Sequence, residues 1–434
     1  MATAFFVLKS SLLLKTYYSY EVTSKVTLKY EKSPEFPAVT ICHFNMLRES
    51  FVKEHKAEKV LEQALWFSLR TNINRSVVNW KEFGNLSMKD VYEKGGHQIK
   101  EMMKTCSWSG EECDARNFTR ILTPMGLCHT FNSGKEGRDI LRVRNAGSKF
   151  GLNLVLDVQQ DEYVSLVADQ AGFMVLIHDQ ETPPMVEELG FAVGPGTTTF
   201  AALSKQKVIN LEAPYETNCS MSTISNIPGF SKYTTSSCML TCHSKYIVEK
   251  CGCRDITLPA LTDNEVQVCD LNDTATCVFR EMENFFKFEG DDCDCQVPCE
   301  TISYKPSLSY GAFPSKSFAY DKARQDFPNT EEGLDGIADA LHENYSENRL
   351  ELNVYFQQMS YELIKQQPAY DDQSLLGEIG GLLGLCIGAS LLTVVEFCDV
   401  IFTILKIRFG PADAFLDRKV KRRKAMKKKT MSAK

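Results

Sequence analysis

Two carboxylates, Glu396 and Asp399, interrupt a long apolar stretch near the C-terminal end of the chain. Residues 379–395 carry no charge, and the apolar residues continue to Leu405. A stretch of about 17 residues is the lower limit for a helix that crosses a bilayer. Carboxylates at membrane depth are energetically costly, and their usual role is to line an ion path. A ring of them, one from each subunit, would attract cations. We therefore place Glu396 in a pore vestibule, while Asp399 fits the pore and the cytoplasmic headgroup level equally well.

Glycines make this stretch unlike a plain membrane anchor. They stand at Gly380, Gly381, Gly384 and Gly388. Glycine allows close approach of backbones and allows a helix to break. A break exposes carbonyl groups, which a membrane tolerates only where they line water or protein. The glycines therefore favour a pore helix over a plain anchor, while the basic cluster Arg418 to Lys429 that follows argues against the other alternative, a buried core helix.

Cysteines are the second set of residues with chemistry of their own. Fourteen of the 16 lie between Cys42 and Cys299, and the other two, Cys386 and Cys398, lie in the apolar segment. This even number predicts seven disulfides formed in the secretory pathway. Zinc is the alternative, but pairs such as Cys251-Gly-Cys253 are spaced more closely than the usual zinc knuckle, so we expect no metal site. Six N-glycosylation sequons agree with an extracellular domain: Asn74, Asn85, Asn117, Asn218, Asn272 and Asn344.

Enzyme motifs are absent from the sequence. It contains no nucleophile elbow, zinc-protease motif, P-loop or dinucleotide-binding glycine pattern. The seven histidines are scattered. We therefore predict that the chain is not an enzyme and has no cofactor.

Charge is divided unevenly along the chain. Residues 406–434 hold twelve Lys or Arg and two Asp, a net charge of +10. Because the whole chain has a net charge of −7, the other residues together carry −17. A basic segment after an apolar one predicts a cytoplasmic tail behind a stop-transfer helix. Nucleic acid is the competing partner for the tail, but the acidic remainder would repel phosphates. We expect no nucleic-acid partner.

The elements that must position these residues fall into four segments. Residues 1–20 are apolar but too short to span, so they fit a signal peptide or, preferably, the outer part of a first transmembrane helix whose start is missing. Residues 21–372 form an extracellular α+β domain, 373–407 a pore-forming second transmembrane helix, and 408–434 the basic tail. Both termini of the complete subunit would be cytoplasmic, and the protein would lie in the plasma membrane.

Periodicity gives a coarse map of the extracellular domain. Strand-like runs occur at Glu35–Cys42, Gly151–Val158, Phe173–His178, Val208–Leu211 and Leu350–Tyr361. Helix-like runs occur at Val52–Ser68, Ser87–Lys104, Ser237–Lys250, Cys277–Phe288 and Glu331–Glu343.

Several tracts together resemble the degenerin/epithelial sodium channel superfamily, most closely its acid-sensing branch. The strongest are the filter-like tract Gly388-Ala389-Ser390 followed by Leu391 to Glu396, the tract Leu375 to Gly381, and Phe36-Pro37-Ala38-Val39-Thr40-Ile41-Cys42. Matches at Phe131 to Gly134, Gln159 to Tyr163, Gly190 to Gly196 and Cys238 to Arg254 extend the similarity over nearly the whole chain. A cysteine-rich receptor on one anchor is the alternative, but an anchor does not need the filter tract or Glu396.

The resemblance implies a homo- or heterotrimer of related subunits, each with palm, β-ball, finger, knuckle and thumb parts, the thumb at about 219–299. It also implies the cysteine pairing, which spacing alone cannot give. The implied pairs are Cys42–Cys128, Cys106–Cys113, Cys219–Cys299, Cys238–Cys295, Cys242–Cys293, Cys251–Cys277 and Cys253–Cys269.

The resemblance further implies an amiloride-sensitive, ligand-gated channel that transports sodium. Gly388, Ala389 and Ser390 would form the selectivity filter, and Glu378, Gly381, Glu396 and Asp399 would line the pore. Tyr20 matches a tyrosine that couples thumb to pore, with Tyr215 where its partner is usually Trp.

Departures from the acid-sensing branch concern the trigger. In the acid-sensing branch, carboxylates crowded together are held to sense protons. In this chain only one such pair, Glu181 and Glu283, would be retained. Other positions where acids are frequent hold Thr182, Phe279, Lys205, Gln357 and Lys365. Met359-Ser360 replaces the usual Leu-Asn of the linker tied to desensitisation. Protons, a peptide or another extracellular ligand, and constitutive opening therefore all remain as gating hypotheses.

Overall fold

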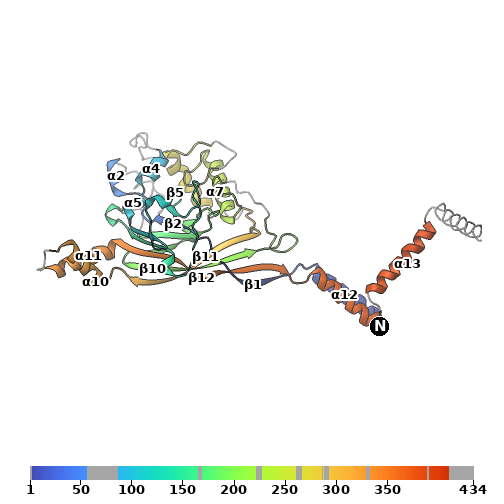
Figure 1. Cartoon of the computed structure of the whole chain (residues 1–434). Coiled ribbons are helices and arrows are strands. Elements are labelled where there is room, and N and C mark those ends of the chain that lie inside the picture. Colours follow the sequence, from blue (N-terminus) through green and yellow to red (C-terminus); the bar gives the residue numbers. More distant parts are fainter. Residues whose placement is uncertain are drawn as a thin grey trace, which may run out of the picture. The chain divides into compact units, whose positions relative to one another are not determined.

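The computed structural model describes residues 2–55, 87–164, 169–220, 227–260, 266–285, 287, 293–328, 333–388 and 391–409. These residues form two compact units, shown together in Figure 1. The larger unit comprises residues 24–213 and 217–366. The smaller unit combines both ends of the chain with residues 214–216.

A seven-stranded sheet forms the base of the larger unit. Its strand order is β11-β10-β12-β7-β3-β4, and β1 also pairs with β12. Only β10 and β12 run parallel among the registers that the structure describes. The strands are β1 (Val22–Tyr30), β3 (Met103–Trp108), β4 (Glu111–Glu112), β7 (Leu152–Asp157), β10 (Thr197–Ile209), β11 (Glu300–Ala312) and β12 (Arg349–Pro368).

A second sheet has five antiparallel strands in the order β5-β6-β2-β8-β9. They are β2 (Ala38–His43), β5 (Phe118–Thr123), β6 (Gly126–Phe131), β8 (Phe173–His178) and β9 (Phe191–Val193). Every residue of β2 and β6 is buried, so neither strand shows the alternating pattern of a sheet with one solvated face.

The main core joins the two sheets. Phe36, Ile41, Phe131 and Phe173 come from the five-stranded sheet and the segment before it. They belong to one cluster with strand residues of the other sheet, namely Leu152, Leu154, Leu156, Leu203, Leu350, Leu352 and Val354. The alternating burial along β7, in which Leu152, Leu154 and Leu156 point inward, is the period-two pattern of a half-buried strand.

Helices lie on one side of these sheets and at one end of them (Figure 1). They are α2 (Glu49–Glu54), α4 (Met88–Gly95), α5 (Ile99–Met102), α6 (Val186–Leu189), α7 (Thr235–Cys251), α8 (Leu271–Asp273), α9 (Phe279–Asn284), α10 (Lys316–Asp326) and α11 (Leu334–Asn348). The long helix α7 begins at a capping box between Thr234 and Ser237 and ends at Gly252, whose φ of 74° suits a glycine.

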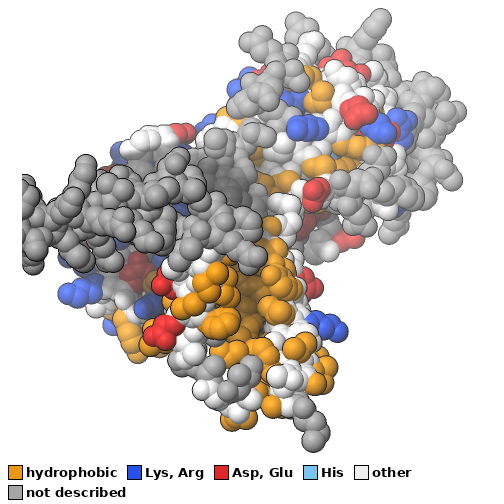
Figure 2. Space-filling view, turned by 90° about the vertical axis from the view of Figure 1, so that its right-hand side faces the viewer, with side chains coloured by type: hydrophobic (Ala, Val, Ile, Leu, Met, Phe, Trp, Pro, Cys, Tyr) orange, Lys and Arg blue, Asp and Glu red, His pale blue; other side chains and the backbone are white. Residues whose placement is uncertain are grey.

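The smaller unit is helical. It contains α1 (Ala2–Tyr17), α12 (Asp372–Ile387) and α13 (Leu391–Phe409), and α1 lies beside α12 with the Tyr17 hydroxyl 2.7 Å from an Asp372 carboxylate oxygen. Its helices expose large apolar side chains, among them Leu8, Leu376, Phe397 and Phe402, and Figure 2 shows hydrophobic side chains gathered on one face of the molecule. Across the described ranges, none of the helices is both sufficiently long and sufficiently apolar to cross a membrane.

The coarse map from the sequence was mostly confirmed where residues are described. The run Phe173–His178 coincides with β8, and Ser237–Lys250 falls within α7. The predicted helix Ser87–Lys104 was wrong in two respects. It divides into α4 and α5 around Gly96, and its end, from Met103, belongs to β3. The helix α4 ends because Gly96 is extended, with φ −66° and ψ 156°. A side chain at Gly96 would meet the Tyr92 carbonyl and the Leu127 side chain, so this close approach requires glycine.

Candidate functional site

Seven disulfides tie the extracellular unit together, and every predicted pair was confirmed. They join Cys42–Cys128, Cys106–Cys113, Cys219–Cys299, Cys238–Cys295, Cys242–Cys293, Cys251–Cys277 and Cys253–Cys269. Cysteines paired in this way are not thiolates, so they cannot serve as the zinc ligands of the alternative hypothesis. The last four pairs staple the small helical region around α7 and α9, whose own core is limited to a few side chains.

The apolar C-terminal stretch is a broken helix. It stops at Ile387, and Gly388 follows with φ 71° and ψ 17°, its N–H bonded to the carbonyl of Gly384 at 3.0 Å. This left-handed conformation is costly for any residue with a side chain. Helix α13 then begins at Leu391. Ala389 and Ser390, the other predicted filter residues, lie outside the described residues.

The predicted pore residues lie on both halves of this broken helix. Glu378 and Gly381 are in α12, and Glu396 and Asp399 are in α13. All four are exposed in the single chain. A spacing of three residues places Glu396 and Asp399 on one face of α13.

Tyr20 and Tyr215 contact each other. Their ring centroids are 5.7 Å apart with the planes at 83°, an edge-to-face pair. Tyr20 has φ 51°, an uncommon conformation for a residue other than glycine. The predicted tyrosine partner is therefore present although Trp is replaced by Tyr.

Met359 and Ser360 lie in an irregular part of β12. Between the pairs Leu203–Phe356 and Lys205–Tyr361, β10 advances by two residues while β12 advances by five. The carbonyl of Met359 accepts a hydrogen bond of 3.1 Å from the N–H of Glu31. The extra residues of β12 form an irregularity in its pairing with β10, of the kind known as a β-bulge.

Lys205 faces a carboxylate beside the same bulge. Its Nζ lies 3.1 Å from Glu31 Oε2 and is 5.4 Å from the centre of the Tyr361 ring. Only 12% of the lysine side chain is exposed. A lysine at this position thus joins β10 to the residue that directly follows β1 by an ion pair, whereas an acid would repel Glu31.

Glu181 is held by groups that favour its charged form. Ser231 donates to Glu181 Oε2 from its N–H at 2.7 Å and from its hydroxyl at 2.6 Å, and Lys135 Nζ lies 3.8 Å from Oε1. Burial raises the pKa of this carboxyl, but the bonds from Ser231 and the charge of Lys135 outweigh burial, so the pKa lies below its usual value.

Glu283 has a different partner. Its carboxylate pairs with Lys287 one helical turn away, and both side chains are more than half exposed. None of these contacts, among the residues that the structure describes, brings Glu181 and Glu283 together. The two surviving acids are therefore each neutralised by a basic neighbour.

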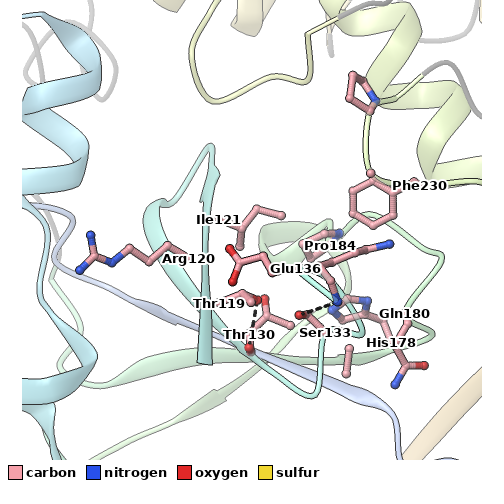
Figure 3. A pocket seen from close by; sticks show the side chains of 14 residues that line it. Thr119, Arg120, Ile121, Thr130, Ser133, Glu136, His178, Gln180, Pro184 and Phe230 are labelled. Atoms are coloured by element: carbon pink, nitrogen blue, oxygen red, sulfur yellow. Dashed lines mark hydrogen bonds between the residues drawn. The ribbon is translucent and has the colours of Figure 1, made fainter. Parts of the chain in front are cut away.

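A pocket of about 280 Å³ lies beside Glu181, between the five-stranded sheet and the segment that leads to α7. In Figure 3, Phe230 approaches from the α7 side, while Arg120 points away from the other labelled side chains. Lys135 Nζ lies 4.3 Å from the centre of the Phe230 ring. The lining is Ala38, Thr119, Arg120, Ile121, Thr130, Ser133, Lys135, Glu136, His178, Gln180, Pro184, Pro228, Gly229 and Phe230.

The sequence did not single out Lys135, Ser231 or Phe230. Lys135 directly follows the tract Phe131 to Gly134, which gave the only hint of its place. Phe230 lines the pocket and Ser231 bonds Glu181, and both lie in the segment before α7, for which periodicity offers no signal.

The family model described as amiloride-sensitive sodium channel matches residues 1–400. The chain belongs to this family. Among its relatives, acid-sensing ion channel 1C of Danio rerio is 32% identical over 90% of this chain and 75% of its own length. Acid-sensing ion channel 2 of Rattus norvegicus is 32% identical over 92% and 79%. Acid-sensing ion channel 4-B of Danio rerio is 34% identical over 86% and 64%.

Among solved structures, a cryo-EM structure of a proton-activated chloride channel matches with a TM-score of 0.33 and 7% identity over 92% of this chain and 95% of that chain. The amiloride-sensitive sodium channel family accounts for the mixed α and β extracellular unit with its seven disulfides. As a member of this ion channel family, the chain is a sodium channel subunit.

Proposed function

We propose that the chain is one subunit of a trimeric, sodium-selective channel in the plasma membrane, with both termini of the complete subunit cytoplasmic. The subunits are identical or related. Each contributes α1, α12, the filter at Gly388–Ser390 and α13 to the membrane part. Sodium is the transported ion, and amiloride blocks the current.

The left-handed turn at Gly388 carries this proposal. It ends α12 at the tract that resembles a selectivity filter. A helix end leaves its last backbone carbonyls without intrahelical partners, and such carbonyls can replace part of the water around a cation. Glu396 and Asp399 follow within three turns and would raise the local concentration of cations.

The trigger follows from the pocket beside Glu181. Because Glu181 and Glu283 each have a basic partner, we propose that this pair is not the proton sensor. Apolar lining with charges of both signs, from Lys135 and Glu136, fits a short peptide. We therefore propose an extracellular peptide as the ligand of this pocket, with acid as the second candidate stimulus because the relatives are named as acid-sensing channels.

The test is expression in oocytes under voltage clamp, with acid, peptide and mechanical stimuli. We expect an inward sodium current that amiloride blocks. A variant Gly388→Ala forces a side chain into the left-handed conformation at a cost of about 1–2 kcal/mol, so its current should be lost or lose sodium selectivity. Gly377→Ala is the matched control, because Gly377 lies in the same helix without a positive φ and with open space around it.

Surface labelling must accompany the currents. Normal surface expression with no current under any of the stimuli would sink the proposal for this subunit alone. A Gly388→Ala current equal to that of Gly377→Ala would contradict the filter assignment. A bulky replacement of Ser390 should likewise abolish current or selectivity while surface expression is retained.

A further inference from the structure

Three histidines that the channel mechanism does not use are buried together in the larger unit. His43 ends β2, His129 lies in β6, and His97 stands between α4 and α5 (Figure 1). Their exposed fractions are 3%, 1% and 1%. Histidines are usually only partly buried, so a group of three needs a physical account.

His43 joins the two sheets of the unit. Its Nε2 lies 2.8 Å from the carbonyl oxygen of Val158, directly after β7, and its Nδ1 lies 2.8 Å from the carbonyl oxygen and 3.0 Å from the N–H of Asn45. The neutral ring donates from Nε2 and accepts from the Asn45 N–H, and at this ring burial, rather than a missing acceptor, opposes a second proton. The ring also contacts Phe173 and Tyr163 edge-on, with centroids 5.1 and 5.2 Å away.

His97 stacks on His43. The ring centroids are 3.7 Å apart and the planes differ by 9°. The Nδ1 of His97 lies 3.0 Å from Gln159 Oε1, so this nitrogen carries the proton. Gln159 has φ 54° and ψ 52°, an uncommon left-handed conformation that places its amide at this contact.

His129 completes the group through the backbone of His97. Its Nε2 donates to the His97 carbonyl at 3.1 Å. This leaves one nitrogen on each of two rings, His97 Nε2 and His129 Nδ1, buried without a hydrogen-bond partner among the described residues. A second proton on either ring would create a buried cation whose new N–H has no acceptor.

Charged groups around the cluster do not compensate for such a proton. Arg48 and Arg120 disfavour it at His97 and His129, while Asp161 and Glu162 favour it at His97. Burial is the largest cause that lowers the pKa of all three rings, and at His43 the neighbouring His97 lowers the pKa further. The pKa is lowered to about 3 for His43 and to about 4 for His97 and His129.

We propose that His43, His97 and His129 form an acid-labile joint between the two sheets, which opens the segment from α4 to α5 when a histidine is protonated. The opened segment continues directly into β3 of the seven-stranded sheet, so the opening reaches the sheet that contains the bulge at Met359. The acid response of this joint is independent of Glu181, of the pocket and of whether the chain conducts.

The direction of the pH effect on opening follows from the pKa values of the histidines in the closed and open states. An exposed histidine titrates near pH 6.5, whereas these rings stay neutral in the closed state to well below pH 5. Protons therefore bind the open state preferentially below pH 6.5. Between pH 7.4 and 5.5 the opening equilibrium should rise about tenfold for each histidine released.

Hydrogen–deuterium exchange of the full chain in detergent tests this proposal. After correction for the intrinsic pH dependence of exchange, we expect the opening constant of residues 88–102 to rise about tenfold or more from pH 7.4 to 5.5, with no matching rise in β10. His97→Gln and His129→Gln should each reduce that rise by about tenfold.

His178→Gln is the matched control. His178 is buried in β8 of the same sheet and its pKa is also lowered to about 4, but both its ring nitrogens have partners, Thr40 Oγ1 at 2.8 Å and the Asp179 carbonyl at 2.9 Å. In this variant the opening constant of residues 88–102 should still rise from pH 7.4 to 5.5 as it does in the native chain. An absent rise in the native chain would overturn the proposal, even if the histidine variants fail to fold. Equal suppression by His178→Gln and His97→Gln would overturn it as well.

Discussion

Glu181 and the cluster of His43, His97 and His129 are two titratable regions of the same extracellular unit. Glu181 is partly exposed and receives two hydrogen bonds from Ser231 and the charge of Lys135. The three imidazoles are almost fully buried, and two of their nitrogens lack partners among the described residues. Partners stabilise the charged form in the first region, and burial stabilises the neutral form in the second.

The difference separates the pH ranges in which each region responds. Glu181 has a lowered pKa, so the stability it contributes is present above its usual pKa near 4.5 and is lost only as pH falls through the lower folded value. The histidines also have lowered pKa values, but their neutral form is the folded one. Their cost to the folded state begins as pH falls below 6.5. Mild acid should therefore act on the cluster and leave Glu181 unchanged.

Removal of His43 should have the largest effect. His43→Ala loses the stack on His97 and leaves the carbonyl of Val158 without its donor, so we expect a loss of about 3 kcal/mol in unfolding free energy at pH 7.5. The loss should be smaller by about 2 kcal/mol at pH 5. At that pH the exposed His43 of the unfolded native chain binds a proton that the folded state excludes, which destabilises the native chain but not the variant. Thermal or chemical unfolding at both pH values measures this.

His342→Ala serves as the control for that measurement, since His342 lies in α11 outside the cluster. A loss for His43→Ala that is equal at both pH values would show that the cluster does not respond to mild acid. The contrast with Glu181 would then disappear.

Loss of Lys135 should have an intermediate effect. Lys135→Met removes the ion pair with Glu181 and the contact with the Phe230 ring, for an expected loss of about 1 kcal/mol near pH 7. The pKa of Glu181 should rise, because one cause of its lowering is removed. The difference in unfolding free energy between the variant and the native chain should therefore become smaller below pH 4. Unfolding curves at pH 7 and 3.5 measure this difference. An unchanged difference would mean that Lys135 acts by packing alone.

Replacement of Glu181 itself should have the smallest effect on the response to mild acid. In Glu181→Gln the amide oxygen can still accept from Ser231, and the native carboxylate is already ionised throughout the range from pH 7.4 to 5.5. We expect the acid-evoked opening constant or current to change by less than about twofold, measured beside Glu283→Gln. A larger change confined to Glu181→Gln would make this carboxylate the proton sensor.

Local patterns predicted much of the fold. The strand β8 and the helix α7 were predicted from short-range periodicity, and the cysteine pairing followed from the resemblance to a family. The predicted helix at Ser87–Lys104 is interrupted at Gly96, which is extended and leaves no room for a side chain beside Leu127, a residue distant in sequence. The predicted sequons that the structure describes, Asn117, Asn218, Asn272 and Asn344, are all exposed. Asn74 and Asn85 lie outside the described residues, as does the basic tail from residue 410.

The candidate sites were predictable to different degrees. Gly388 was singled out by the resemblance to a filter tract, and its residue type agrees with the left-handed conformation, which glycine adopts without strain. The partners of Glu181 and Glu283 were not predicted. Lys287 is one helical turn from Glu283, but Ser231 and Lys135 reach Glu181 from separate parts of the chain.

By itself, the sequence determined the apolar segment with its glycines and carboxylates, the number of cysteines available for disulfides, and the family. These properties depend on residue type and on spacing along the chain. Only the tertiary structure decided which charges neutralise one another and which histidines share a buried site. His43, His97 and His129 are far apart in sequence, and they acquire a common pKa direction only because folding removes all three from water.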